Sequence, residues 1–260
     1  MKKKQVIVAC LLVILCAGLG IVVYFYFSSK DDIGIASTPG STNTGSKAKV
    51  GCTSDVRLEN EPQYDRALSL IKQRIDNQFD FTDEKLKFAY FPSQLTNCIK
   101  IVEKNMEGAG IEGSFTFHSE DIQDNYFPIT VDVGYSDTDD VLTALLLSHE
   151  MTHVQQYINE VNNTEELLCV DKEVEAFIAQ LGFYTLLNNE EISAAYYRIQ
   201  NDDHLHPQLQ VLDAMMTINR ESSCGFEGVD FGRECKRKNL YSHLKTIISE
   251  DAFYKQECGL

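Results

Sequence analysis

Two histidines and a glutamate stand at a spacing that suits a bound metal ion. They are His149, Glu150 and His153, in the run HEMTH. In a helix, residues four apart lie on one face, so both imidazoles can reach a single metal ion. Glu150 is the next residue round the helix and leans toward a metal-bound water. The pattern is the H-E-x-x-H zinc motif, whose chemistry is activation of that water with the glutamate as general base.

The residues before the motif predict the helix that it requires. Ser136 or Asp137 can cap the first turn, and the acidic residues that follow suit the positive end of the helix dipole. Between cap and motif, apolar residues lie on most sides, as in a helix that runs through a core. We therefore expect a buried helix over residues 136–160.

A third metal ligand must come from elsewhere, because catalytic zinc generally takes three protein ligands and leaves one position for water. The metzincin pattern requires Gly and His where this chain has Gln156 and Asn159, and the Asp of an aspzincin, in its Gly-Thr setting, is absent. Glu173 lies far enough beyond His153 for one helix to end and a second to cross back over it. The other acidic candidates are Glu175 and, more weakly, Glu165, Glu166 and Asp171.

The motif and a later segment together resemble a known family. HEMTHVQQ followed by EVEA is similar to the gluzincin metallopeptidases, in particular to families that read H-E-x-x-H-x-x-Q with a later E-x-x-A-D. The resemblance is confined to residues 128–185, and it implies a zincin-like fold, one Zn²⁺ per chain and Glu173 as the third ligand. Phe177 stands where the later acid is often found, which leaves open which group orients the motif histidines.

These residues predict a zinc-dependent peptidase, most simply an endopeptidase, that acts on a protein or peptide substrate. His149, His153 and Glu173 would hold the metal, and Glu150 would act as the base. A further donor normally stabilises the oxyanion, and its candidates are Tyr157, Tyr196, Tyr197, His118, His204, His206 and Arg220.

Other functions compete with peptide hydrolysis. The chain could be a catalytically inactive, membrane-tethered relative that keeps the fold for binding, or an interaction module built on its helices. The same centre could also hydrolyse a substrate other than a peptide. Glu150 argues against the non-catalytic alternatives, because a structural zinc site needs no carboxylate beside its histidines.

The remaining elements predict an α+β fold, with a small mixed sheet followed by a mostly helical C-terminal half. Residues 61–79 have the three-four apolar spacing of a packing helix, with Pro62 early in it. Short apolar runs separated by turn residues then predict three or four strands, at 86–91, 98–102, 113–118 and 126–135. We expect residues 128–133 to form an edge strand over the active-site helix, where backbone pairing could hold an extended peptide.

The N-terminal region predicts attachment to a membrane. Residues 5–27 are uncharged, apolar and long enough to span a bilayer, and the basic residues 1–4 would stay in the cytoplasm. The run is longer than a typical signal peptide, so a signal anchor is favoured over a cleaved signal or a lipoprotein site at Cys10. Residues 28–51 would be a flexible linker, and 52–260 an extracellular or periplasmic metallopeptidase domain.

Charge and cysteines limit the partners and the compartment. A net charge of −16 excludes a nucleic-acid partner on electrostatic grounds. Cys10 and Cys16 lie in the apolar segment, and the six cysteines beyond it predict disulfide bonds in an oxidising compartment. Six cysteines allow 15 pairings, among which Cys224 with Cys235 is the favoured local pair.

Overall fold

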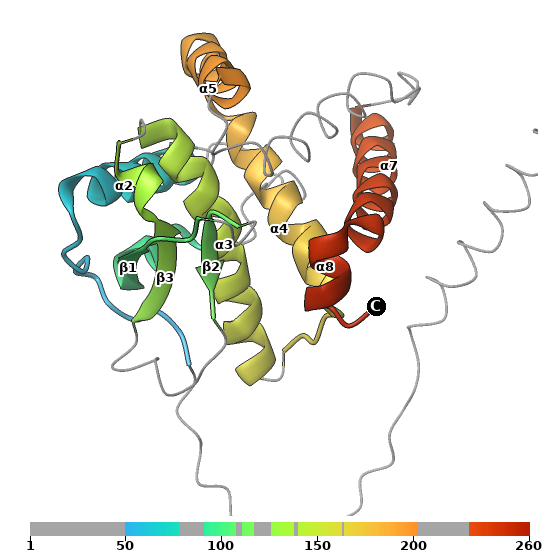
Figure 1. The fold of residues 1–260 in the computed structure, drawn as a ribbon, viewed down its shortest axis with the longest axis horizontal. Helices are drawn as coiled ribbons and strands as arrows, with labels where there is room; N and C mark the ends of the chain where they lie inside the picture. Colours follow the sequence, from blue (N-terminus) through green and yellow to red (C-terminus); the bar gives the residue numbers. More distant parts are fainter. Residues whose placement is uncertain are drawn as a thin grey trace, which may run out of the picture. The chain divides into compact units, whose positions relative to one another are not determined.

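A small mixed sheet and a larger set of helices make up the described part of the chain, which confirms the predicted α+β class (Figure 1). The computed structural model describes residues 50–77, 91–107, 111–116, 126–137, 140–162, 164–201 and 229–260. They belong to the unit Ala48–Leu260. Its elements are α2 (Pro62–Asp76), η3 (Ser93–Cys98), β1 (Ile99–Lys104), β2 (Gly113–Phe115), β3 (Phe127–Asp132), η4 (Val133–Asp137), α3 (Asp140–Val161), α4 (Cys169–Tyr184), α5 (Asn189–Asn201), α7 (Val229–Glu250) and α8 (Ala252–Glu257).

The predicted membrane location is corrected by the structure. No helix within the described ranges is long and apolar enough to cross a bilayer. The longest of them, α3 and α7, have 22 residues each but carry charged side chains along their length. This finding contradicts the prediction of a single-pass membrane protein, which is withdrawn. The predicted anchor at residues 5–27 lies outside the described residues.

The sheet has the order β1-β3-β2, so β3 lies in its centre. β1 runs parallel to β3 and β2 runs antiparallel to it. The prediction that residues 128–133 form the edge strand is therefore wrong. The strand at the edge beside α3 is β2, as Figure 1 shows. Alternating burial along β3 shows that one of its faces packs on the core, but such alternation does not reveal how many strands pair with it.

α3 is the central helix of the described fold. Every residue from 142 to 154 is buried, because α2, the sheet and α4 all pack against it. The helix begins at Asp140, later than predicted, since Ser136 and Asp137 belong to the 3-10 turn η4. The helix predicted over 61–79 is α2, which starts with Pro62 and buries its apolar face.

Two disulfides join segments that are distant in sequence. Cys52 bonds to Cys98, which ties the start of the described chain to the end of η3. Cys169 bonds to Cys258, which ties the first turn of α4 to the residue that follows α8. Disulfide formation is thus confirmed for these cysteines, whereas the side chains of the predicted Cys224 and Cys235 pair lie outside those described.

Candidate metal centre

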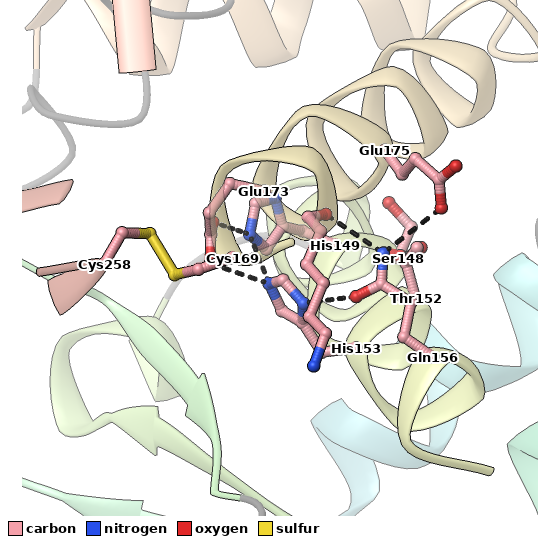
Figure 2. Close-up of polar contacts among 10 residues, drawn as sticks. Ser148, His149, Thr152, His153, Gln156, Cys169, Glu173, Glu175 and Cys258 are labelled. Atoms are coloured by element: carbon pink, nitrogen blue, oxygen red, sulfur yellow. Dashed lines mark hydrogen bonds and ion pairs between the residues drawn. A yellow bond between two sulfur atoms is a disulfide. The ribbon is translucent and has the colours of Figure 1, made fainter. Parts of the chain in front are cut away.

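α3 and α4 bring the two motif histidines and one carboxylate together, as Figure 2 shows. The Nε2 atoms of His149 and His153 are 3.2 Å apart. The Oε2 atom of Glu173 is 3.6 Å from His149 Nε2, and its Oε1 atom is 3.5 Å from His153 Nε2. These side chains, called the ligand cluster below, could hold a metal ion. The sequence predicted all of its members.

The position of Glu173 follows from how α4 packs. The chain turns after α3, and α4 begins at Cys169, so Glu173 lies one turn into the helix. Val174, Phe177 and Leu181 are buried on the side of α4 that contributes to the core. This packing lays α4 across α3 with the Glu173 carboxylate facing the imidazoles.

Gln156 fixes the orientation of His153. The amide Nε2 of Gln156 donates to the Lys172 carbonyl oxygen at 3.0 Å and to Glu175 Oε2 at 3.4 Å. Its Oε1 atom therefore faces His153 Nδ1, at 2.9 Å, and accepts the ring proton. With the proton on Nδ1, the neutral form of His153 presents the lone pair of Nε2 to the ligand cluster.

His149 is held by packing instead. Its Nδ1 atom is buried and has no hydrogen-bond partner among the described residues. The ring of Phe177 lies edge-on to the imidazole, with centroids 4.6 Å apart. In the families with the E-x-x-A-D pattern, an acid often stands at the position of Phe177. Here an aromatic contact with His149 takes the place of the hydrogen bond that such an acid could accept from a histidine.

Glu150 lies beside the ligand cluster without belonging to it. Its side chain is buried beneath β2, and the backbone N–H of Phe115 donates to its carboxylate. A methyl group placed on Gly113 would lie 3.3 Å from Glu150 Oε1, which shows how closely the strand covers this residue. The carboxylate is therefore held at the edge strand, next to the histidines.

The buried charges of the centre influence one another. Burial raises the pKa of Glu150 above its ordinary value, although the nearby histidines oppose this shift. Burial opposes ionisation of Glu173, but His153 and His149 outweigh it and hold its pKa well below the usual range. Burial likewise opposes the charged form of His153, yet Glu173 raises the pKa of His153 to about 9. Without a metal, His153 therefore favours its charged form, with a second proton on Nε2. A cation bound at the centre can take the place of that second proton.

The other acidic candidates have different partners. Glu175 accepts a hydrogen bond from Gln156, so it supports His153 indirectly. Asp171 accepts from Tyr241 and Lys245 on α7. Glu165 accepts from Asn159 at the end of α3, and Glu166 is exposed. None of these acids is part of the ligand cluster.

The proposed oxyanion donors are mostly distant from the cluster or outside the described residues. Tyr196 and Tyr197 are exposed on α5, which follows the opposite end of α4 from Glu173. The side chain of Tyr157 packs against Phe115 of β2, with ring centroids 5.8 Å apart. The candidates that fall outside the described residues are His118, His204, His206 and Arg220.

Sequence reasoning missed Tyr254 of α8. Its ring contacts Phe177 edge-on, with centroids 6.1 Å apart. Burial and the charges of Glu173 and Glu150 raise the pKa of Tyr254 well above its ordinary value. The only sequence signal for this placement is Cys258, one helical turn later, whose partner the sequence could not identify.

No known family, curated protein or solved structure matches this chain. The resemblance to gluzincins accordingly rests on the two motifs alone. The fold and the site together define an α+β protein with a buried His-His-Glu cluster that could hold a metal ion.

Proposed function

We propose that this protein is a zinc-dependent peptidase of the gluzincin type with a zincin-like fold. The observation that carries the proposal is the ligand cluster, in which the nitrogen and oxygen atoms of His149, His153 and Glu173 lie 3.2 to 3.6 Å apart. Ligand atoms about 2.0–2.1 Å from a tetrahedral zinc ion lie about 3.3 Å from one another. Imidazole nitrogens also suit zinc better than calcium or magnesium, which prefer oxygen ligands.

The residues around the cluster support hydrolysis rather than a structural role for the metal. Bound zinc would polarise a substrate carbonyl and lower the pKa of a bound water. Glu150 lies outside the ligand cluster with a raised pKa, so it can accept a proton from the attacking water and return it to the leaving amine. A purely structural centre would gain nothing from this buried carboxylate.

The edge strand supports a peptide as the substrate. In the described sheet, β2 pairs on one side only, with β3, and it lies directly over Glu150. An extended peptide can pair with an edge strand of this kind, which would place its backbone carbonyls beside the cluster. An antiparallel edge strand above a metal-binding helix also supports the zincin-like arrangement.

Replacement of Glu150 by Gln tests the proposal. We expect wild-type protein to bind about one zinc ion per chain and to cleave members of a quenched fluorescent peptide library. Glu150→Gln should lower kcat by about 10²- to 10⁴-fold and leave the zinc content unchanged, because the residue handles the proton and does not hold the metal. Zinc is measured by atomic emission and cleavage by fluorescence.

Glu160→Gln is the matched control. Glu160 is on the same helix but pairs with Lys172, and its substitution should leave both zinc content and cleavage unchanged. Wild-type protein without zinc, or a Glu150→Gln protein as active as wild type, would refute the peptidase. Zinc binding with no cleavage of any substrate would instead support an inactive zincin-fold binding domain.

A further inference from the structure

The Cys169–Cys258 disulfide aligns two helix faces at the metal centre. Cys169 and Glu173 are four residues apart on α4, so both lie on one face of that helix. Tyr254 and Cys258 are also four residues apart, and the Cys258 backbone N–H donates to the Tyr254 carbonyl oxygen at 2.8 Å. The disulfide joins one end of each pair. Tyr254 is thereby brought toward Glu173.

Ring contacts connect Tyr254 to the centre through Phe177. The Phe177 ring contacts His149 with centroids 4.6 Å apart, and it contacts Tyr254 with centroids 6.1 Å apart. Tyr254 also interacts electrostatically with both Glu173 of the ligand cluster and Glu150. The ring contact and these interactions together place Tyr254 on the side of the centre that Phe177 lines.

The helix that carries Tyr254 is fixed at both ends. Asp251 caps the start of α8, where its carboxylate accepts from the backbone N–H groups of Phe253 and Tyr254. At the other end, Cys258 is bonded to α4. A side chain held on a fixed helix loses little conformational freedom when a substrate binds, which is what transition-state stabilisation requires.

We propose that Tyr254 is a catalytic residue that donates a hydrogen bond from its hydroxyl to the oxyanion formed from the scissile carbonyl. The inference rests on the proposed peptidase function and deepens it. The water oxygen bonds to the carbonyl carbon, and the carbonyl π electrons move to its oxygen, which accepts the hydrogen bond. Glu150 takes the water proton and transfers it to the amide nitrogen as the carbon–nitrogen bond breaks. Tyr254 keeps its own proton throughout.

Replacement of Tyr254 by Phe tests this role while keeping the ring that packs on Phe177. Removal of one oxyanion donor typically lowers kcat by about 10²- to 10³-fold. We expect a loss of that size for Tyr254→Phe on the library peptide that wild-type protein cleaves fastest, with KM within about twofold of wild type. Zinc content and the Cys169–Cys258 bond should be unchanged, as measured by atomic emission and by mass after alkylation.

Tyr241→Phe is the matched control. Tyr241 is on α7, and its hydroxyl also faces α4, where it donates to Asp171, which is not part of the ligand cluster. Its substitution should leave kcat and KM close to wild type.

A second probe is a phosphinic peptide, which mimics the tetrahedral intermediate. The affinity of the Tyr254→Phe variant for this peptide should fall by the same factor as its kcat/KM.

The outcomes separate this inference from the proposed function. An active wild-type protein whose Tyr254→Phe variant has unchanged kcat would refute the role of Tyr254 and leave the peptidase intact. Loss of zinc, or a rise in KM with unchanged kcat, would show that Tyr254 only supports the fold, and would also overturn the inference. Absence of any peptide cleavage by wild-type protein would refute both.

Discussion

At the scale of single residues, the two motif histidines are held by different means. His153 donates to Gln156, whereas His149 packs against Phe177. Gln156 is itself fixed by the Lys172 carbonyl and by Glu175, so a chain of hydrogen bonds runs from α4 back to His153 on α3. This chain holds a proton on Nδ1 of His153, so that Nε2 is the nitrogen left to bind a metal.

Gln156 and its neighbour Gln155 allow a direct test of this orientation. Gln156→Ala removes the acceptor of the His153 ring proton, and loss of such a partner typically weakens metal affinity by about 10- to 100-fold. Gln155 donates to Asn159 and not to the centre, so Gln155→Ala should leave the affinity unchanged. Competition with a chromogenic zinc chelator measures both. Equal affinities in the two variants would show that Gln156 does not orient the ligand.

The ligand cluster could be predicted from sequence because its spacing is local. His149 and His153 are on one helix, so helix periodicity predicts them, whereas the choice of Glu173 among the acids of the next helix came from the resemblance to the E-x-x-A motif. Tyr254 could not be predicted in this way. It reaches the centre through the Cys169–Cys258 bond, and sequence spacing cannot select one pairing among the possible ones.

At the scale of elements, periodicity predicted which segments are helices and strands but not every neighbour. α2, β1, β2, β3 and α3 all overlap predicted segments, while the strand predicted at 86–91 lies outside the described residues except for Phe91. The choice of edge strand was wrong because β3 has the alternating burial of a strand with one core face, and either a central or an edge strand can show it. The start of α3 was placed too early because capping residues are also common in turns such as η4.

The close contact between β2 and α3 predicts a specific effect at Gly113. A Cβ atom there would lie 3.0 Å from Leu146 Cδ1 and 3.3 Å from Glu150 Oε1. Gly113→Ala should therefore push β2 away from α3 and cost about 1–3 kcal/mol of stability, as overpacking typically does. Because β2 covers the base and would pair with the substrate, kcat/KM should fall while the zinc content stays the same.

Gly51→Ala is the control for this substitution, since no atom lies within 4 Å of the Cβ position there. It should leave both the unfolding temperature and kcat/KM unchanged. Calorimetry and peptide cleavage measure the two quantities. A Gly113→Ala protein with wild-type kcat/KM would show that β2 does not take part in substrate binding.

At the scale of the whole molecule, the two disulfides hold different parts of the fold. Cys52–Cys98 closes a span of 46 residues beside β1, at the edge of the sheet opposite β2. Cys169–Cys258 closes a span of 89 residues and joins the residue after α8 to the end of α4 that carries Glu173. Both bonds restrict the unfolded chain, but only the second positions a side chain at the proposed active site.

The two bonds should therefore affect stability alike and catalysis differently. Cys52→Ala with Cys98→Ala, and Cys169→Ala with Cys258→Ala, should each lower the unfolding free energy by about 2–4 kcal/mol. The first pair should keep its kcat at a temperature where the protein is folded. The second should lose kcat toward the level of Tyr254→Phe while retaining zinc, because the ligand cluster lies entirely on α3 and α4. Equal kcat values in the two double variants would show that α8 needs no covalent tether to place Tyr254.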